Sequence, residues 1–366
     1  MAVSKIDPGQ IYFITEMEQG TKKSTGYYKI GIVRNLRSTY DRIKEHQTAN
    51  PHRLYAAEVV DTDAPLMVES MLHGKYNSKR ASGEWFKFTP SELATVIKEA
   101  KKLSGIYGPK LSALRANYSV TPSKGILTLS GKDLTDTEKL RDKAYQLDKE
   151  IMELKYKMKT IEHTLEAATG TNGDGIDGVT YVDHKDGATK FNFTMWKSAA
   201  TAAQLKACEK QVSPKDDFRI LYPKNGNKAA NKTLTNAHWK KELVTSFNVY
   251  ELAKSSVVNH PTSAFTQTSV ARNKLYEKMH EEYSEYSVKQ QIMKIKLTTI
   301  DLEIRLICQQ YQGIAGICEW ERKPKPPEIN ESLMKNNFPA DTINPLFMKT
   351  TTDTSTVKFY LYRPYV

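Results

Sequence analysis

The sequence predicts an α+β multidomain protein with a small α/β domain, long heptad helices that form a coiled coil, and a basic α+β head domain. Three observations lead to this prediction. Short runs rich in Ile, Val, Tyr and Phe alternate with helical patterns in the first quarter of the chain. Two long apolar seams with heptad spacing come later. The segment between those seams has a concentration of basic residues.

These patterns divide the chain into six parts. They are an α/β domain (1–104), a basic linker (105–134), a first coiled-coil helix (135–169), the basic head (170–268), a second coiled-coil helix (269–313) and a C-terminal tail with a terminal strand (314–366). A chain of 366 residues suggests two or three domains. Its 39% hydrophobic and 26% charged residues indicate a globular protein rather than a disordered one.

Composition also excludes several classes of protein. No stretch approaches the roughly eighteen consecutive apolar residues of a membrane span. The three cysteines form no C-x-x-C pair, so we expect neither a disulfide framework nor a zinc knuckle, and a reducing compartment such as the cytoplasm is the default location. A net charge of +12 and a pI near 9.2 favour a polyanionic partner.

The first domain opens with two runs of strand composition. They are GQIYFI (Gly9–Ile14) and YYKIGIV (Tyr27–Val33), and a polar loop with Gly at both ends separates them. Tyr12 belongs to the first run and Lys29 to the second. The sequence therefore places a hydroxyl group and a cation on neighbouring strands.

Two helical patterns follow in the same domain. Thr39–His46 carries Arg42 and His46, which are four residues apart and so share one helix face. Ala64–Tyr76 carries Glu69 in its most apolar part. The domain thus combines a hydroxyl group, a cation, an arginine fork and a carboxylate.

This set of side chains suits phosphodiester hydrolysis. The attacking water needs a base or an orienting partner. The pentacovalent phosphate needs positive charge, which an arginine fork supplies bidentately. A lone carboxylate together with a substrate phosphate can hold Mg²⁺, which stabilises a leaving oxygen. A tyrosine in a strand and an arginine on a helix have ordinary structural roles too, and we favour function because the motifs occur together.

The order of the motifs resembles the GIY-YIG nuclease superfamily, and more narrowly its phage-associated branch, in which YIG becomes KIG and a GEWF-like segment closes the domain. The resemblance covers about the first quarter of the chain. It maps the family's first tyrosine onto Tyr12, its YIG motif onto Lys29-Ile30-Gly31, its helical arginine onto Arg42 with a partner histidine at His46, and its metal-binding glutamate onto Glu69. It implies DNA cleavage or nicking that depends on Mg²⁺ (or Mn²⁺).

The sequence departs from the family pattern at two points. Lys29 replaces the second tyrosine and could contact a phosphate or, if buried, act as a base. The family's late asparagine has no clear counterpart, and Asn77 is a nearby candidate. Glu84, Trp85 and Phe86 are assigned to a strand whose aromatic side chains close the small core.

Two alternatives to a nuclease stay open. Some members of the resembled branch bind DNA without cutting it, so the first alternative is a non-catalytic DNA-binding regulator with a silent nuclease fold. The second is a coiled-coil structural or assembly protein. For the main reading we expect DNA as the partner, and the host cytoplasm as the location if the chain is encoded by a phage.

Two heptad seams lie beyond the linker. A capping box at Thr135–Glu138 precedes the first, which runs to Gly170, and the second runs from Tyr276 to Tyr311. Burying an apolar side chain contributes roughly 1.5–3 kcal/mol, so each seam needs a partner. We favour an antiparallel hairpin with the head at its tip, and a homodimer through the coiled coil is the alternative.

Half of the net charge of +12 lies in one short piece of the head, residues 206–241. Residues 206–241 carry nine Lys or Arg against three Asp or Glu, whereas residues 1–104 carry sixteen against twelve. Lysine-rich turns suit contacts with a nucleic-acid backbone, which give affinity more than sequence reading. A plain solvated face is the open alternative. The candidate DNA-binding residues are Lys206, Lys210, Lys215, Arg219, Lys224, Lys228, Lys232, Lys240 and Lys241.

Overall fold

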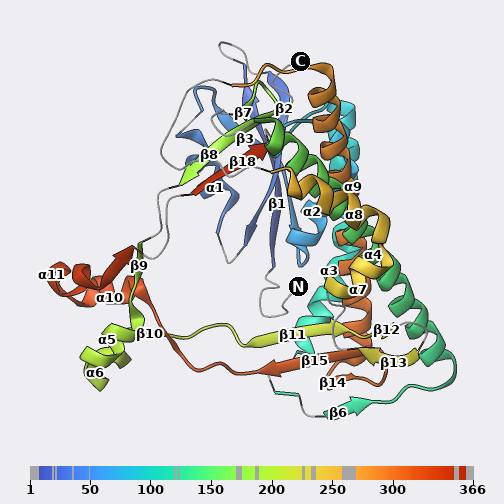
Figure 1. Ribbon diagram of the computed structural model, residues 1–366, viewed down its shortest axis with the longest axis vertical. Coiled ribbons are helices and arrows are strands. Elements are labelled where there is room, and N and C mark those ends of the chain that lie inside the picture. The colour runs from blue at the N-terminus through green and yellow to red at the C-terminus, as the bar shows by residue number, and fades with distance from the viewer. Residues whose placement is uncertain are drawn as a thin grey trace.

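The computed structural model describes residues 8–18, 20, 23–34, 37–48, 50–118, 121–122, 124–169, 175–185, 189–224, 227–231, 236–257, 269–349 and 354–359. Its mixture of helices and several sheets agrees with the predicted α+β multidomain class (Figure 1). In the part of the chain so described, no helix is both long enough and apolar enough to cross a membrane.

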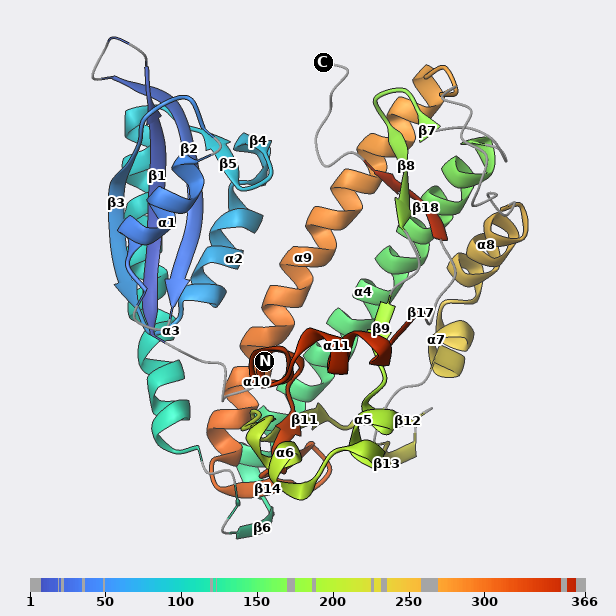
Figure 2. The same cartoon turned by 90° about the vertical axis from the view of Figure 1, so that its left-hand side faces the viewer.

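The N-terminal region forms a five-stranded antiparallel sheet with helices on both faces (Figure 2). Its strands lie in the order β3-β1-β2-β5-β4. The elements are β1 (Gly9–Met17), β2 (Ser24–Arg34), α1 (Thr39–Gln47), β3 (Leu54–Thr62), α2 (Pro65–Lys75), the 3-10 turn η2 (Asn77–Lys79), β4 (Arg80–Ser82), β5 (Trp85–Lys87) and α3 (Pro90–Ala116). The two strands and two helices predicted to carry site residues are confirmed, with ends shifted by a few residues.

Side-chain alternation divides β1 between two apolar layers. Ile11 and Phe13 belong to the large core formed with α2 and α3, whereas Tyr12 and Ile14 belong to a smaller cluster on the α1 side. Successive residues of a strand point to opposite faces. Lys29 of β2 is the direct partner of Ile14. Tyr12 and Lys29 therefore share the face of the sheet that α1 covers.

Two long helices form the centre of the molecule. α4 (Gly131–Thr169) and α9 (Lys274–Cys308) pack side by side in opposite directions (Figure 2). The Gln290 side chain donates to the Ile151 carbonyl oxygen across this contact at 3.2 Å. Each apolar seam thus finds its partner within the same chain, in the antiparallel arrangement that we favoured. Supercoiling of these helices and a homodimer through them stay predictions.

The predicted capping box at Thr135–Glu138 is wrong. α4 begins four residues earlier, at Gly131, whose φ of 56° suits a glycine. The Thr135 hydroxyl donates to the Gly131 carbonyl oxygen at 3.1 Å, a contact of a threonine inside a helix rather than at its cap.

The predicted linker at 105–134 is also shorter than expected. α3 continues through its first part to Ala116, because Leu111 and Leu114 are buried in the core. Local composition, rich in Gly, Ser and Lys, could not reveal that burial. The short strand β6 (Lys124–Leu127) then pairs in parallel with a strand that follows α9.

The N-terminal domain shares one core with the central helices. α2 and α3 both pack against α9. Gly74 of α2 lies so close to α9 that a Cβ there would be 3.2 Å from Ile292 Cγ1. The apolar cluster that contains Phe86 and Val96 continues without a break to Ile304. The sheet domain is therefore held firmly by α9 rather than tethered by a flexible linker.

The segment between α4 and α9 does not form a separate head at the hairpin tip. Its elements are β7 (Gly175–Ile176), β8 (Thr180–Lys185), β9 (Thr189–Phe191), α5 (Phe193–Ala199), α6 (Ala202–Ala207), β10 (Glu209–Lys210), β11 (Lys215–Ile220), β12 (Tyr222–Lys224), β13 (Asn227–Asn231), α7 (Asn236–Glu242) and α8 (Val244–Ser255). Those after α9 are β14 (Tyr311–Ile314), β15 (Cys318–Lys323), β16 (Glu328–Ile329), α10 (Glu331–Asn337), α11 (Ala340–Ile343), the 3-10 turn η3 (Asn344–Leu346), β17 (Phe347–Lys349) and β18 (Thr354–Phe359).

The middle segment and the C-terminal tail pair strand by strand. β8 pairs with β18, β9 with β17, β10 with β16 and β11 with β15, in nested order. The partners are about a hundred residues or more apart in sequence, so local patterns could not predict them. In Figure 1 the pairs lie at different places, with β8 and β18 beside the upper part of the central helices, β9 to the lower left, and β11 and β15 across the base.

A small lobe with its own core lies between these paired segments. We call residues 189–210 and 328–349 the satellite lobe; in Figure 1 it lies to the lower left of the central helices. Its core residues are Phe191, Trp196, Cys208, Met334 and Ile343. On the other side of the molecule, α8 packs along α4. The elements expected to form one basic head are thus distributed over several separate places.

A four-stranded sheet in the order β11-β15-β14-β6 closes the base of the central helices around a buried ion pair. Asp216 accepts a hydrogen bond from Arg305 at 3.1 Å and another from the indole of Trp320 at 2.7 Å. The side chains of Asp216 and Arg305 are 1% and 5% exposed. The Arg305 guanidinium also stacks over the ring of Phe218.

We expect Asp216→Ala to destabilise the protein by about 3 kcal/mol, because it removes the closer of the two carboxylates that pair with the buried Arg305 and leaves Asp301 at 3.4 Å as the other. Chemical denaturation checks this value. The control is Asp217→Ala, which removes the exposed neighbouring pair with Arg219 and should cost less than about 1 kcal/mol. Equal losses in the two variants would contradict the assignment.

Candidate active site

Tyr12 lies directly against the backbone of Gly31. The two residues are partners across β1 and β2, and Tyr12 is 1% exposed. A Cβ on Gly31 would lie 2.4 Å from the Tyr12 hydroxyl oxygen, which is closer than these atoms can approach. Only glycine leaves room for the ring at this point. The glycine of the KIG motif therefore fixes the position of the phenol.

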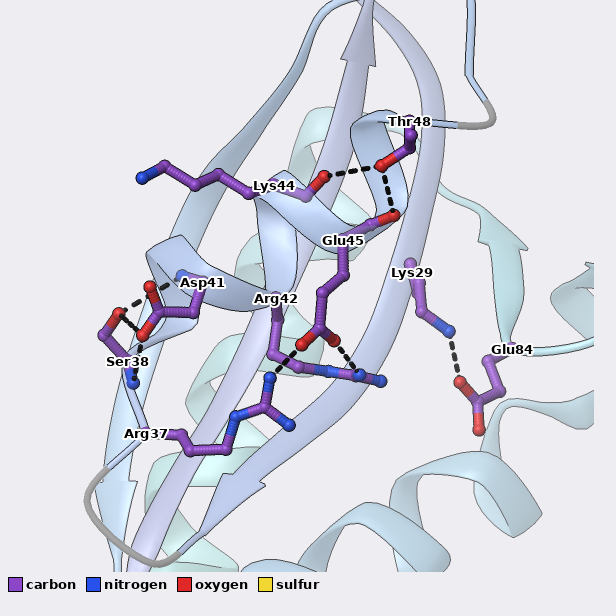
Figure 3. Close-up of polar contacts among 9 residues, drawn as sticks. All are labelled: Lys29, Arg37, Ser38, Asp41, Arg42, Lys44, Glu45, Thr48 and Glu84. Atoms are coloured by element: carbon purple, nitrogen blue, oxygen red, sulfur yellow. Dashed lines mark hydrogen bonds and ion pairs between the residues drawn. The ribbon is translucent and has the colours of Figure 1, made fainter. Parts of the chain in front are cut away.

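Arg42 contacts the phenol from α1. Its guanidinium interacts with the Tyr12 phenol. It also forms a hydrogen bond with Glu45, whose carboxylate pairs with Arg37 as well (Figure 3). Burial raises the pKa of Tyr12, and the hydrogen bond and charge of Arg42 offset that effect only in part. The phenol is therefore protonated at neutral pH, with Arg42 held against its oxygen.

Lys29 forms an ion pair with Glu84, which lies between β4 and β5 (Figure 3). Lys29 is 8% exposed. Burial alone would raise the pKa of Glu84, but the hydrogen bond and charge of Lys29 hold it below its usual value. The Ile30 amide donates to the Glu84 carbonyl oxygen at 3.1 Å, which fixes the turn against β2.

Glu84 is the residue that the sequence analysis missed. It was assigned, with Trp85 and Phe86, to a structural strand because aromatic residues dominate that segment. Trp85 does pair with Lys29 across β5 and β2, and this pairing brings the preceding carboxylate to the lysine. Two features of the sequence could have identified Glu84 as a site residue. They are the lysine in place of a tyrosine and the second carboxylate in the closing motif.

Glu69 has the most perturbed carboxylate of the group. Burial, and after it the nearby Glu84 charge, raises the pKa of Glu69 to about 7, against the smaller opposing effects of Lys29 and Arg34. No hydrogen bond or ion pair joins Glu69 to another described residue. A partly buried carboxylate without a bonded cation is a suitable oxygen ligand for a hard metal ion.

His46 has an unsatisfied ring nitrogen on the same side of the site. Its Nε2 atom is buried and has no hydrogen-bond partner among the described residues. Burial lowers the pKa of His46, and the charges of Lys29 and Arg42 lower it further. The imidazole is therefore neutral at neutral pH and can accept a proton.

His73 and Asn77 have structural roles instead. His73 Nε2 contacts the Ile30 carbonyl oxygen at 3.0 Å, and its ring packs on Phe86. Asn77 accepts a hydrogen bond from Arg80 at 2.9 Å. These contacts hold the strand and the turn that carry Lys29 and Glu84.

The structure brings all five candidate catalytic residues into one cluster. They come from β1, β2, α1 and α2. The charge of Glu84 acts on Tyr12, His46 and Glu69, and its carboxylate pairs with Lys29. Arg42 interacts with Tyr12 and His46. Mg²⁺ fits this donor set because Glu69 offers an oxygen ligand and a bound phosphate would offer others. Among the described residues, no group of three or more His, Cys, Asp or Glu side chains forms a complete metal cage.

The nine candidate DNA-binding residues do not converge in the same way. Lys206 and Lys210 belong to the satellite lobe, Lys215 and Arg219 to β11, Lys224 to β12, Lys228 to β13, and Lys240 and Lys241 to α7, while Lys232 lies outside the described residues. Lys215 pairs with Glu321 and Arg219 with Asp217. Figure 1 shows these elements spread across the molecule. A DNA-binding role for them stays a prediction.

We expect Gly31→Ala to lower the free energy of unfolding by about 1–3 kcal/mol, because the added Cβ forces the Tyr12 ring out of its place. Gly105→Ala is the control. It lies on α3 with nothing within 4 Å of the added atom, so it should instead stabilise the protein by about 0.5–1 kcal/mol. Denaturant titration measures both, and equal effects would contradict the close contact.

Glu69 gives a prediction about pH. A folded-state pKa of about 7, raised from 4.5, means that stability is complete below pH 4.5 and is lost as pH rises through 7. We expect Glu69→Gln to match the parent protein at pH 4 and to be more stable by about 3 kcal/mol at pH 8. Thermal unfolding across that range measures the difference.

Glu92→Gln serves as the control with the opposite sign. Lys79 and the Thr89 cap hold the pKa of Glu92 at about 2, so its charged form stabilises the fold. The Gln variant should be less stable than the parent at pH 8. If Glu69→Gln is also less stable than the parent at pH 8, the carboxylate of Glu69 has a stabilising partner, and the prediction is contradicted.

The N-terminal site lies within a recognised domain. Residues 9–101 match the family described as T5orf172 domain, which covers about a quarter of the chain. This is a phage-associated, nuclease-like type of domain, so the match supports a nuclease-like N-terminal region that interacts with DNA. No curated protein and no solved structure matches the chain.

Proposed function

We propose that the chain is a Mg²⁺-dependent DNA endonuclease or nickase of the GIY-YIG type, with its active site at Tyr12, Arg42 and Glu69. One observation carries the proposal. The Tyr12 phenol is fixed between the bare backbone of Gly31 and the Arg42 guanidinium, beside a buried carboxylate. A core tyrosine alone would require neither the arginine nor the carboxylate.

Tyr12 and His46 divide the activation of water between them in this proposal. The Tyr12 hydroxyl interacts with Arg42 and keeps its own proton, so it can donate to and orient a water molecule. His46 is neutral, with Nε2 unpartnered among the described residues, and can take the proton as that water attacks phosphorus.

Arg42 and Lys29 supply positive charge. Arg42 stabilises the negative charge that develops on the phosphoryl oxygens, and its contact with Tyr12 orients it before substrate arrives. The carboxylate of Glu84 holds Lys29 in place as its ion-pair partner. We therefore assign Lys29 a positioning and phosphate-contact role and not that of the base.

Glu69 is the residue that would hold Mg²⁺, with waters and a substrate phosphate as the remaining ligands. When bound, the metal ion supplies charge stabilisation to the leaving oxygen. The raised pKa of Glu69 fits this role, since the folded protein disfavours its charge until a cation neutralises it.

The first alternative, a DNA-binding regulator without catalysis, also has an observation in its favour. Lys29 stands at the position where the resembled family has its second tyrosine, and it forms an ion pair with the carboxylate of Glu84. If that phenol is indispensable for proton transfer, the site binds a phosphate without hydrolysing it. Assay of cleavage separates the two functions.

The test is incubation of the full chain with supercoiled plasmid in Mg²⁺ or in EDTA. We expect nicked or linear plasmid only with Mg²⁺, and a loss of at least about 100-fold in rate for Tyr12→Phe and for Glu69→Gln. Gel electrophoresis over time gives the rates.

Two variants control for unspecific damage. Tyr107→Phe removes a phenol from α3, and Glu58→Gln removes a carboxylate from β3 that pairs with Lys101. Both should cut at the parent rate. Absence of cutting by the parent protein, or cutting that survives in Tyr12→Phe and Glu69→Gln, would refute the proposed nuclease.

A further inference from the structure

A cavity of about 490 Å³ opens at the edge of the N-terminal sheet. Its walls come from β2, η2, β4, β5 and the first turn of α3. Cations are the main charged groups in this wall, namely Lys79, Arg80 and Lys87, and Glu92 is the acidic residue among them. None of these residues belongs to the catalytic group proposed above.

The cavity lies next to the candidate active site along the same two strands. Tyr27, in its wall, is the cross-strand partner of Lys87, and Lys29 is the partner of Trp85. Residues two apart in a strand point to the same face, roughly 7 Å from each other. Tyr27 and Lys87 therefore lie beside Lys29 on the same face of these strands. Arg80, in contrast, stacks on Phe86 from the α2 and α3 side of the sheet edge.

The cations of the cavity differ in how far their charge is compensated. Lys79 forms an ion pair with Glu92 at 2.7 Å, so these two charges cancel. Lys87 is exposed, lies over the Tyr27 ring with its ammonium 5.2 Å from the ring centre, and pairs with no carboxylate among the described residues. The cavity therefore has an excess of positive charge.

Arg80 is held in the wall by neutral acceptors. It donates to the Asn77 side chain at 2.9 Å and to the carbonyl oxygens of Gly83 and His73, and its guanidinium stacks on the Phe86 ring. No carboxylate among the described residues bonds to it. Burial lowers the pKa of Arg80, and the charge of Glu84 opposes this effect only in part. An anion in the cavity would stabilise the Arg80 cation.

We propose that this cavity binds a backbone phosphate of the DNA strand, adjacent to the phosphate that the active site receives. Lys87 and Arg80 contribute the charge, and the hydroxyl groups of Ser78 and Thr89 can donate to the phosphate oxygens. The inference rests on the proposed DNA-cleaving function in that DNA is the ligand of both sites. It gives the N-terminal domain its own means of fixing the strand, without the basic residues of the middle segment.

The test measures binding of the full chain to a duplex DNA of about twenty base pairs in EDTA, so that no cleavage occurs. Fluorescence anisotropy at several salt concentrations gives the slope of log K against log salt, whose magnitude falls by about 0.9 for each phosphate that the protein no longer neutralises. We expect this magnitude to fall by about 0.9 in Lys87→Gln with Arg80→Gln, which removes both cations from the one phosphate, and by part of that amount in Lys87→Gln alone.

Lys101→Gln is the matched control. It makes the same change in net charge at the opposite edge of the sheet, where Lys101 pairs with Glu58 of β3. It should leave the slope unchanged. Thermal unfolding establishes that each variant is folded, and Lys87 is exposed, so its replacement leaves the core intact.

Two results would overturn the proposal. One is a slope in Lys87→Gln equal to that of the parent protein, and the other is an equal fall in Lys101→Gln, which would reveal a general effect of charge. The plasmid assay tests the nuclease proposal independently of the cavity. Plasmid cutting with an unchanged slope would remove only the cavity's role, whereas a changed slope without cutting would leave a phosphate site on a non-catalytic binder.

Discussion

The apolar contact between α9 and its neighbours positions most of the molecule. One face of α9 pairs with α4, and other parts contact α2, α3 and β14. The contact with α2 is close because Gly74 has no side chain to separate the helices. Glu69 lies on that same helix, so the packing that fixes α2 also fixes the carboxylate of the candidate site. The sheet domain and the central helices therefore behave as one packed body, and experiments on the site are best done with the whole chain.

Within the sheet domain, the site is organised by close contacts that each restrict one side chain. Gly31 and Arg42 hold the Tyr12 phenol from two sides, and Glu84 holds Lys29. Glu69 is the exception, since it is partly buried and no described residue bonds to it. A partly buried carboxylate without a partner lowers stability when it is charged. A role in binding a cation explains why such a residue is present. Such perturbed groups gather at functional sites more often than elsewhere.

The sequence was sufficient to predict the elements whose partners are close in the chain. Strands β1 and β2 and helices α1 and α2 follow from local composition, and the five catalytic candidates were found because the motifs that carry them come in a fixed order. Distant pairing was not predictable. Strand β8 pairs with β18, and the linker residues Leu111 and Leu114 join a core built from helices far along the chain. Glu84 was missed for a similar reason, because its partner Lys29 is reached only through the pairing of β5 with β2.

The most direct test of the central claim is the source of the oxygen in the products. Cleavage of a labelled DNA duplex by the full chain with Mg²⁺ in ¹⁸O-water, followed by mass spectrometry of the fragments, identifies the attacking group. The account predicts one ¹⁸O atom in the terminal phosphate of each break, and no breaks with Arg42→Gln. Fragments without ¹⁸O, or breaks that persist in that variant, would contradict hydrolysis at this site.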